Sequence, residues 1–226
     1  MDHSFNERVQ QMLIQIVPFF MAIVFHEFGH GFVAKLWGDR TATDAGRLTL
    51  NPLAHIDPIG TVALPILNMV TGFPLFIGWA KPVPINPTRF RKYRPGLFWV
   101  AIAGPATNII MAFLSALFLC AFLKWAPEDF SLYRPIAMMA NVGIQINFVL
   151  AIFNLFPLPP LDGSKILESF LNYNATQILR QLERYSFFIL IALLWSGAFS
   201  VIERPVNFLH HIAMAVGQAV FAINLG

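Results

Sequence analysis

The chain has 226 residues, of which 57% are hydrophobic and 12% are charged. Soluble globular domains carry about 25% charged residues, so this chain holds more apolar material than a water-facing fold of its size needs. Fifteen basic and twelve acidic residues leave a net charge of only +3. These figures exclude a soluble enzyme, a disordered chain and a nucleic-acid binder. The single cysteine, Cys120, excludes an internal disulfide and a zinc site built from thiolates.

Long stretches without formal charge divide the chain. Between Arg8 and Lys35 the only charge is Glu27, and further uncharged runs cover residues 58–80, 95–123, 135–161, 185–202 and 205–226. A helix that crosses a bilayer needs about 20 apolar residues. The runs therefore predict an all-α polytopic membrane protein with five to six transmembrane helices. We expect one membrane domain over residues 1–226, with a core at about 9–170 and a C-terminal helical hairpin at about 185–226 that breaks at residues 203–205. The non-basic start of the chain predicts no cleavable signal peptide.

The first run contains His26-Glu27-Phe28-Gly29-His30, which has the spacing H-E-x-x-H. Positions four apart lie on one face of a helix, so both histidines can direct a ring nitrogen at one metal ion. Zinc suits two imidazoles and a carboxylate with a fourth position left to water, and Glu27 is close enough to accept a proton from that water. Three ionisable side chains within five residues of a membrane span are costly unless they pair or bind something. This favours catalytic zinc, with a structural metal or a proton relay as the alternatives.

Two histidines do not complete a zinc site, and few residues can supply the third ligand. His55 and Asp57 lie in the loop after the first run, and His210 and His211 lie in the last run. Asp162 follows a stretch with three prolines between residues 157 and 160, which forbids a continuous helix. Broken backbone at membrane depth is tolerated where protein or a wet cavity surrounds it. We therefore expect this stretch to line a cavity, and we choose Asp162, its one charge, as the third ligand.

At these residues the sequence resembles a known family, the site-2 proteases, which are intramembrane zinc metalloproteases. The resemblance rests on H-E-F-G-H at 26–30, A-G-P-x-x-N at 103–108 and N-x-x-P-x-P-x-L-D-G at 154–163, and covers roughly residues 20–170. It implies one zinc ion per chain, with His26, His30 and Asp162 as ligands. It also implies Glu27 as the catalytic acid/base and Asn154 as a polar group near the reacting carbonyl. The chain resembles a compact form without a PDZ or CBS domain and without a span before the H-E-x-x-H helix.

The three ligands must meet at one depth, which constrains the topology. If residues 58–80 form a re-entrant segment, the C-terminal ends of runs 9–34 and 135–161 fall on the same side of the membrane. If residues 58–80 cross, these ends fall on opposite sides. Basic residues favour the cytoplasmic side, and the re-entrant arrangement places 11 of the 15 basic residues there, against 9 for the crossing arrangement. We therefore expect the N-terminus outside, the C-terminus inside and the zinc in the cytoplasmic half of a prokaryotic inner membrane.

Two weaker patterns concern substrate binding. Residues 46–51 alternate polar and apolar side chains, which predicts a short strand. This small membrane-associated β element either adds an unwound substrate as an extra strand or is an ordinary interfacial hairpin. Asn108, Asn147 and Asn154 lie within the apolar runs, where interhelical hydrogen bonds are their default role.

Together the sequence predicts an intramembrane zinc metalloprotease that hydrolyses peptide bonds in or near transmembrane segments of other membrane proteins. Its expected partners are a transmembrane substrate protein and the lipid bilayer, and not nucleic acid. The alternative is a non-enzymatic zinc-binding membrane protein, a transporter or a sensor. Transport favours acids and histidines spread along several spans, whereas this chain concentrates them at one place. A third interpretation, an inactive relative that only binds membrane proteins, is disfavoured by the presence of Glu27.

Overall fold

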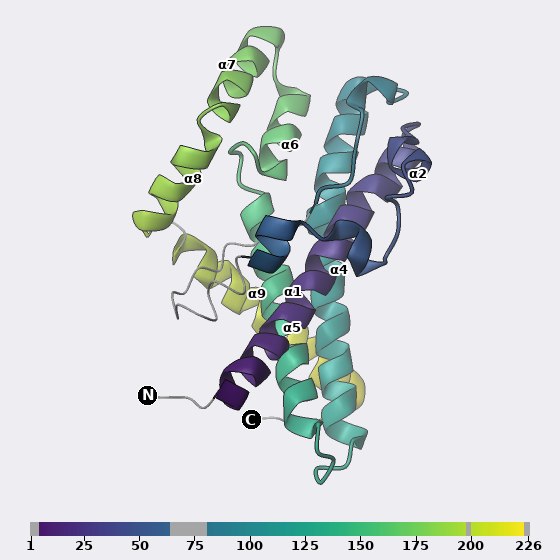
Figure 1. The fold of residues 1–226 in the computed structure, drawn as a ribbon, viewed down its shortest axis with the longest axis vertical. Helices are drawn as coiled ribbons and strands as arrows, with labels where there is room; N and C mark the ends of the chain where they lie inside the picture. Colours follow the sequence, from purple (N-terminus) through teal and green to yellow (C-terminus); the bar gives the residue numbers. More distant parts are fainter. Residues whose placement is uncertain (1–4, 64–80, 198–199, 224–226) are drawn as a thin grey trace.

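Three long apolar helices form the framework of the computed structural model, which describes residues 5–63, 81–197 and 200–223 (Figure 1). They are α1 (Phe5–Leu36), α4 (Tyr93–Trp125) and α5 (Tyr133–Asn154). Each is long and apolar enough to cross a bilayer, over Gln10–Leu36, Tyr93–Trp125 and Tyr133–Asn154. Large apolar side chains on these helices are exposed, among them Val17 and Phe118. Surfaces of this kind suit lipid, and the protein is an integral membrane protein.

Between α1 and α4 the described chain forms only short elements. These are α2 (Thr41–Asp44), η1 (Pro52–His55), η2 (Pro58–Ala63) and η3 (Pro87–Arg89). The described residues contain no strand and residues 47–51 are irregular, so the predicted β element is not confirmed. In a strand the Thr49 carbonyl would accept a hydrogen bond from a neighbouring strand. Here it accepts one from Nε2 of His55 at 2.9 Å. The predicted re-entrant segment at 58–80 lies mostly outside the described residues.

Four helices follow α5: α6 (Asp162–Phe170), α7 (Tyr173–Glu183), α8 (Ser186–Trp195) and α9 (Ser200–Phe221). The predicted break at residues 203–205 is wrong, because α9 continues through Pro205. Pro205, the sixth residue of α9, removes the hydrogen bond to the Val201 carbonyl and crowds that carbonyl, yet the helix continues past it. Gly197, after α8, has a φ of 72°, and a residue in this left-handed conformation ends a helix. Three of the described helices meet the length and composition of a membrane span, so five to six spans are not confirmed.

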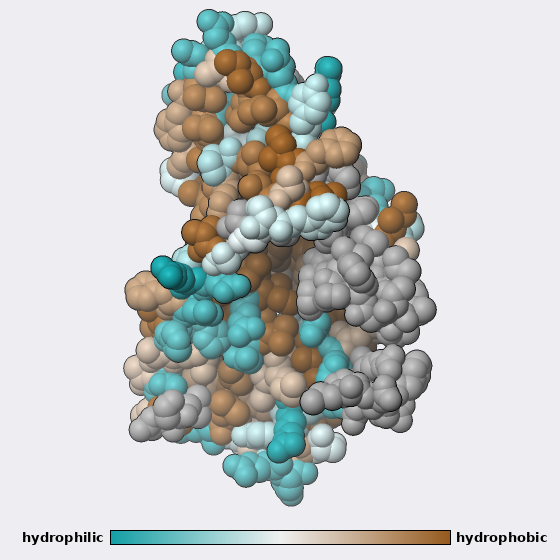
Figure 2. Space-filling model, turned by 90° about the vertical axis from the view of Figure 1, so that its left-hand side faces the viewer, coloured by the Kyte–Doolittle hydropathy of each residue, from teal (hydrophilic) through white to brown (hydrophobic). Residues whose placement is uncertain are grey.

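The helices pack through small side chains. Ala112 and Ala116 of α4 are fully buried, and a Cβ added to Gly217 of α9 would lie 2.7 Å from the sulfur of Cys120. Small residues let backbones approach closely, and such close packing holds membrane helices together where lipid removes the hydrophobic driving force. Figure 1 shows α9 lying behind the lower part of the α4–α5 pair, while α6, α7 and α8 stand beside its upper part. Figure 2 shows hydrophobic side chains exposed over much of one face, with hydrophilic ones frequent at its two ends.

The C-terminal end of α1, the start of α4 and the end of α5 lie at the same end of the bundle (Figure 1). The backbone amide of Arg91 donates to the Trp37 carbonyl at 2.9 Å, which joins the end of α1 to the segment before α4. The guanidinium of Arg94 donates to the Leu171 carbonyl at 3.0 Å, which ties the end of α6 to the start of α4. The segments that carry the predicted ligands therefore meet at this end of the molecule.

Candidate metal centre

His26 and His30 lie one turn apart in the C-terminal half of α1 and are each 7% exposed. Their Nε2 atoms are 3.0 Å apart. Asp162, the first residue of α6, is 6% exposed. Its Oδ2 lies 3.1 Å from Nε2 of His26 and 3.0 Å from Nε2 of His30. Among the described residues, this is the single group of three metal-ligand side chains whose donor atoms lie within 4.8 Å of one another.

Two glycines allow this approach. A Cβ on Gly104 of α4 would collide with the rings of both His26 and His30, so α4 can lie against α1 here only without a side chain. A Cβ on Gly163 would collide with backbone atoms at the end of α5, so the first turn of α6 can fold back onto α5 only at a glycine. The proline-rich residues 155–161 between α5 and α6 are not helical, as the sequence predicts.

Hydrogen bonds at the far side of each ring determine which nitrogen carries the proton. The amide nitrogen of Asn108 donates to the Ala22 carbonyl at 3.0 Å, so its oxygen faces His26 and accepts from Nδ1 of that ring. Nδ1 of His30 donates to the Val100 carbonyl at 2.6 Å. Each neutral ring therefore carries its proton on Nδ1 and directs the lone pair of Nε2 toward the carboxylate of Asp162. This is the tautomer that metal-binding histidines adopt.

The cluster fits zinc. Three lone pairs that point at one another over about 3 Å repel unless a cation lies between them, and a single proton would satisfy only one of the three contacts. Ligand atoms about 2.0 Å from a tetrahedral zinc ion lie about 3.3 Å apart, close to the 3.0 and 3.1 Å observed here. Two nitrogens and one carboxylate oxygen form the ligand set of a catalytic zinc site, which leaves one position free.

Glu27, next to His26 in α1, is half-buried and held by a segment distant in sequence. Its Oε2 accepts a hydrogen bond from the backbone amide of Val83 at 2.7 Å. Val83 belongs to residues 81–86, which we call the connecting segment. The guanidinium of Arg47 donates to the Lys81 carbonyl of this segment at 2.9 Å. The H-E-x-x-H motif predicts that Glu27 borders the metal centre, but the sequence carried no signal for its contact with Val83.

The other predicted candidates make their hydrogen bonds with groups outside the three-residue cluster. The amide nitrogen of Asn154 donates to the Leu150 carbonyl at 2.9 Å, within its own helix. His55 contacts Thr49 within its loop, and Asp57 accepts from the backbone amide of Gly60 at 2.8 Å. Nε2 of His210 lies 3.1 Å from the Asn141 oxygen, and the ring of His211 packs on that of His210. Asn108, in contrast, contacts the metal cluster directly; its place in A-G-P-x-x-N was the available signal.

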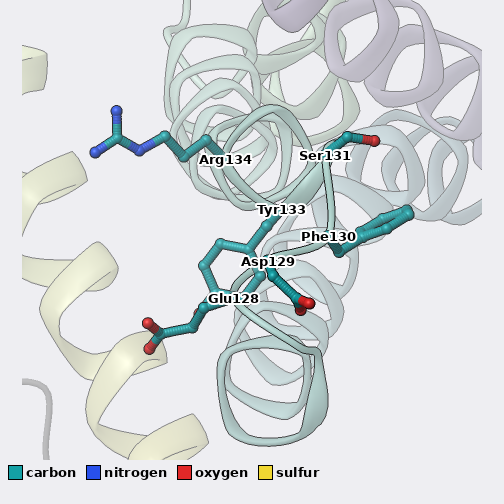
Figure 3. A pocket seen from close by; sticks show the side chains of 6 residues that line it. All are labelled: Glu128, Asp129, Phe130, Ser131, Tyr133 and Arg134. Atoms are coloured by element: carbon teal, nitrogen blue, oxygen red, sulfur yellow. The ribbon is translucent and has the colours of Figure 1, made fainter.

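A pocket of about 610 Å³ lies at the loop between α4 and α5, away from this cluster (Figure 3). Its lining residues are Glu128, Asp129, Phe130, Ser131, Tyr133 and Arg134. Figure 3 shows their charged groups spread around the loop and not converging on one point. The donor geometry therefore favours the histidine cluster over this pocket as the functional site.

An H-E-x-x-H helix joined by a distant aspartate inside a bundle of membrane helices defines a membrane-embedded zinc metallopeptidase. Comparison with known proteins agrees. The model of peptidase family M50 matches residues 128–197, which include Asp162. The chain is 37% identical over 207 residues, 91% of each chain, to the Bacillus subtilis protein named "Putative zinc metalloprotease YwhC". It is 31% identical over 186 residues, 82% of this chain and 68% of the relative, to "Putative zinc metalloprotease Rip2" of Mycolicibacterium smegmatis.

A shorter match, 35% identical over 72 residues, covers 30% of this chain and 32% of "Putative zinc metalloprotease MJ0611" of Methanocaldococcus jannaschii. No solved structure gives a significant match. The chain belongs to peptidase family M50, the site-2 proteases. It is an intramembrane zinc metalloprotease, which confirms the predicted activity and cofactor.

Proposed function

We propose that His26, His30 and Asp162 hold the zinc ion and that Glu27 is the catalytic acid/base. One observation carries this proposal: two imidazole nitrogens and a carboxylate oxygen, all buried, converge to within 3.0–3.1 Å inside a bundle of apolar helices. We further propose that residues 1–226 act as one membrane domain, with a C-terminal hairpin of α8 and α9.

Zinc bound at this cluster supplies a Lewis acid that lowers the pKa of water and polarises a peptide carbonyl. Glu27 takes a proton from the attacking water, and the oxygen of that water bonds to the carbonyl carbon. The same carboxyl then delivers the proton to the amide nitrogen as the carbon–nitrogen bond breaks. The Val83 amide engages Oε2 of Glu27, which fixes the carboxyl plane and leaves Oε1 for the proton. Asn154 stabilises the oxyanion once its amide leaves the Leu150 carbonyl.

The depth of the site determines the substrate class. His26 and His30 lie within the span Gln10–Leu36, and Asn108 and Val100 behind their rings lie within the span Tyr93–Trp125. A peptide bond reaches such a site through the bilayer, so the substrate is a segment in or near the transmembrane part of another membrane protein. The segment must unwind locally, because the hydrogen bonds of a helix shield its peptide groups.

Basic side chains support a cytoplasmic orientation for the end of the bundle that holds the cluster. Exposed lysine and arginine residues gather where α1 ends and α4 begins, namely Lys35, Arg40, Lys81, Arg89, Arg91, Lys92 and Arg94. Basic residues near span ends favour the cytoplasmic side, here of a prokaryotic inner membrane. Labelling of introduced cysteines in cells tests this orientation. We expect Arg91→Cys to react only with membrane-permeant reagent and Asp129→Cys, in the α4–α5 loop, to react with impermeant reagent. The reverse pattern would overturn the orientation.

Metal analysis tests the ligand set. We expect Asp162→Ala to lose zinc and proteolysis of a single-pass model substrate, because two imidazoles alone bind zinc weakly. Asp44→Ala, which removes an exposed carboxylate in α2, is the matched control and should retain both. Unchanged zinc content in Asp162→Ala would remove this residue from the ligand set.

Glu27→Gln tests the acid/base. The amide keeps the size of the side chain but cannot take a proton, so zinc should stay bound while cleavage stops. Undiminished cleavage would eliminate Glu27 as the base. Zinc retention without cleavage in the wild type would instead favour a non-enzymatic zinc protein.

A further inference from the structure

Behind the metal cluster, a chain of buried amides joins the three spanning helices. Asn108 of α4 is 0% exposed and Asn147 of α5 is 3% exposed. The amide nitrogen of Asn108 donates to the Asn147 oxygen at 2.8 Å. The amide nitrogen of Asn147 donates to the Gly143 carbonyl at 2.8 Å. At the other end of this series of hydrogen bonds, Nδ1 of His26 donates to the Asn108 oxygen.

The Gly143 carbonyl is the final acceptor in this series of hydrogen bonds, and it determines the direction of each of the others. A backbone carbonyl accepts only, so Gly143 requires the nitrogen of Asn147 to face it. The oxygen of Asn147 must then face Asn108 and can accept only from its amide nitrogen. The Asn108 amide has two hydrogens, one for Asn147 and one for the Ala22 carbonyl. Its oxygen is thereby turned toward His26.

We propose that Asn147 is a positioning residue of the metal centre, which acts through Asn108 to hold His26 in the Nδ1-protonated tautomer and in a fixed ring orientation. The side chain of Asn147 hydrogen-bonds to Asn108 and to the Gly143 carbonyl, so it reaches His26 through Asn108. Without it, one buried N–H of Asn108 has no acceptor, and the Asn108 side chain is free to seek other rotamers. A fraction of the His26 rings then carries the proton on Nε2, and those rings have no Nε2 lone pair to offer the metal. The inference rests on the proposed role of His26 as a ligand.

Zinc affinity of the full-length chain in detergent, measured by chelator competition, tests the proposal. We expect Asn147→Leu to weaken zinc binding about tenfold, the lower end of the range for groups that orient metal ligands. Asn147→Ser is the second variant, in case the leucine variant does not fold. A serine in a helix bonds back to the carbonyl four residues earlier, here Gly143, so this change removes only the contact with Asn108. It should weaken zinc binding to a similar extent.

Asn147→Asp, buried in its neutral form with its O–H donating to the Gly143 carbonyl, restores an acceptor toward Asn108 and should recover zinc affinity to within about threefold of the wild type. Ile144→Val, a fully buried change on the same helix, controls for altered packing of α5 and should leave zinc affinity unchanged. Thermal unfolding of the zinc-free variants is measured beside it, because a purely structural role would lower the unfolding temperature without changing zinc affinity. Wild-type zinc affinity in Asn147→Ser, or no recovery in Asn147→Asp, would overturn the proposal.

His26→Ala distinguishes a failure of the positioning role of Asn147 from a failure of the proposed ligand set. If this variant loses zinc while the Asn147 variants bind it normally, only the positioning role fails. If His26→Ala binds zinc as the wild type does, the ligand set itself is wrong.

Discussion

Replacing Gly104 by alanine tests whether close packing of α4 on α1 sets the metal geometry. The added Cβ would lie 2.6 Å from Cε1 of His26 and of His30, whereas ordinary contacts to a Cβ span 3.4–4 Å. The rings or the helix must therefore move by roughly 1 Å. Functional groups need to be held within about 0.5 Å of their productive geometry, so this displacement exceeds what the site tolerates.

The size of the loss in zinc affinity depends on how much more the added methyl group strains the zinc-bound protein than the zinc-free protein. Without zinc, α4 and the two rings can shift together to relieve the contact with the new methyl group, whereas bound zinc requires both rings in place. The strain of overpacking, about 1–3 kcal/mol, therefore appears in the metal-binding free energy. This corresponds to zinc binding that is about 5- to 150-fold weaker.

The assay is zinc affinity by chelator competition, with proteolysis of a single-pass substrate measured at saturating zinc. Gly143→Ala is the matched control, because a Cβ there would meet its nearest neighbour, Oγ of Ser115, at 3.4 Å. This control should bind zinc to within about threefold of the wild type, because the methyl group makes only ordinary contacts and the backbone carbonyl of residue 143 remains available to Asn147. Equal zinc affinities for Gly104→Ala and Gly143→Ala would refute the reasoning.

Three further predictions concern groups around the site. Burial raises the pKa of the Asp39 carboxyl, but hydrogen bonds from Thr41 and the Asn86 amide outweigh burial and hold it below its ordinary value. The stabilisation is therefore full above the unfolded-state pKa and is lost as the pH falls through the folded-state pKa. Asp39→Asn should lower stability by about 1–3 kcal/mol at pH 7 and flatten this acid dependence in thermal unfolding; an unchanged profile would contradict it. Arg47→Leu should slow proteolysis with zinc affinity unchanged, because it frees the connecting segment that holds Glu27; equal loss of both would place Arg47 in metal binding. Arg180→Ala, which breaks an exposed ion pair to Glu168 of 2.8 Å, should change stability by less than about 1 kcal/mol; a larger loss would show that α7 depends on this pair.

The metal cluster was largely predictable because its residue types are rare in this chain. Helical spacing alone places His26 and His30 on one face. Asp162 stood out as the one charge beside a proline-rich break in an apolar run, and the structure brings its carboxylate to both rings. Prolines interrupt a helix, and a charge in an apolar run needs a partner, whatever the rest of the fold is. Both features can therefore be predicted from the sequence alone.

The supporting groups were not predictable in the same way. Asn108, Asn147 and Asn154 are the same residue type in similar apolar surroundings. The motif A-G-P-x-x-N sets Asn108 apart, but the sequence does not show which group its side chain contacts, because tertiary packing decides that. The contact between Glu27 and Val83 joins a side chain to a backbone amide, which any residue but proline can supply. The strand expected at 46–51 is not confirmed, because alternation of polar and apolar residues predicts two differently exposed faces but not the presence of a partner strand.

The donor atoms of the cluster come from both ends of a long stretch of chain, with Asp162 132 residues after His30. During synthesis the ribosome therefore releases the two imidazoles well before the carboxylate, with α4 and α5 still to be inserted. A nascent chain holds an incomplete ligand set until its third long helix is in place. A chain that ends before α6 lacks the Asp162 carboxylate, so we expect it to bind zinc weakly and to be inactive as a protease.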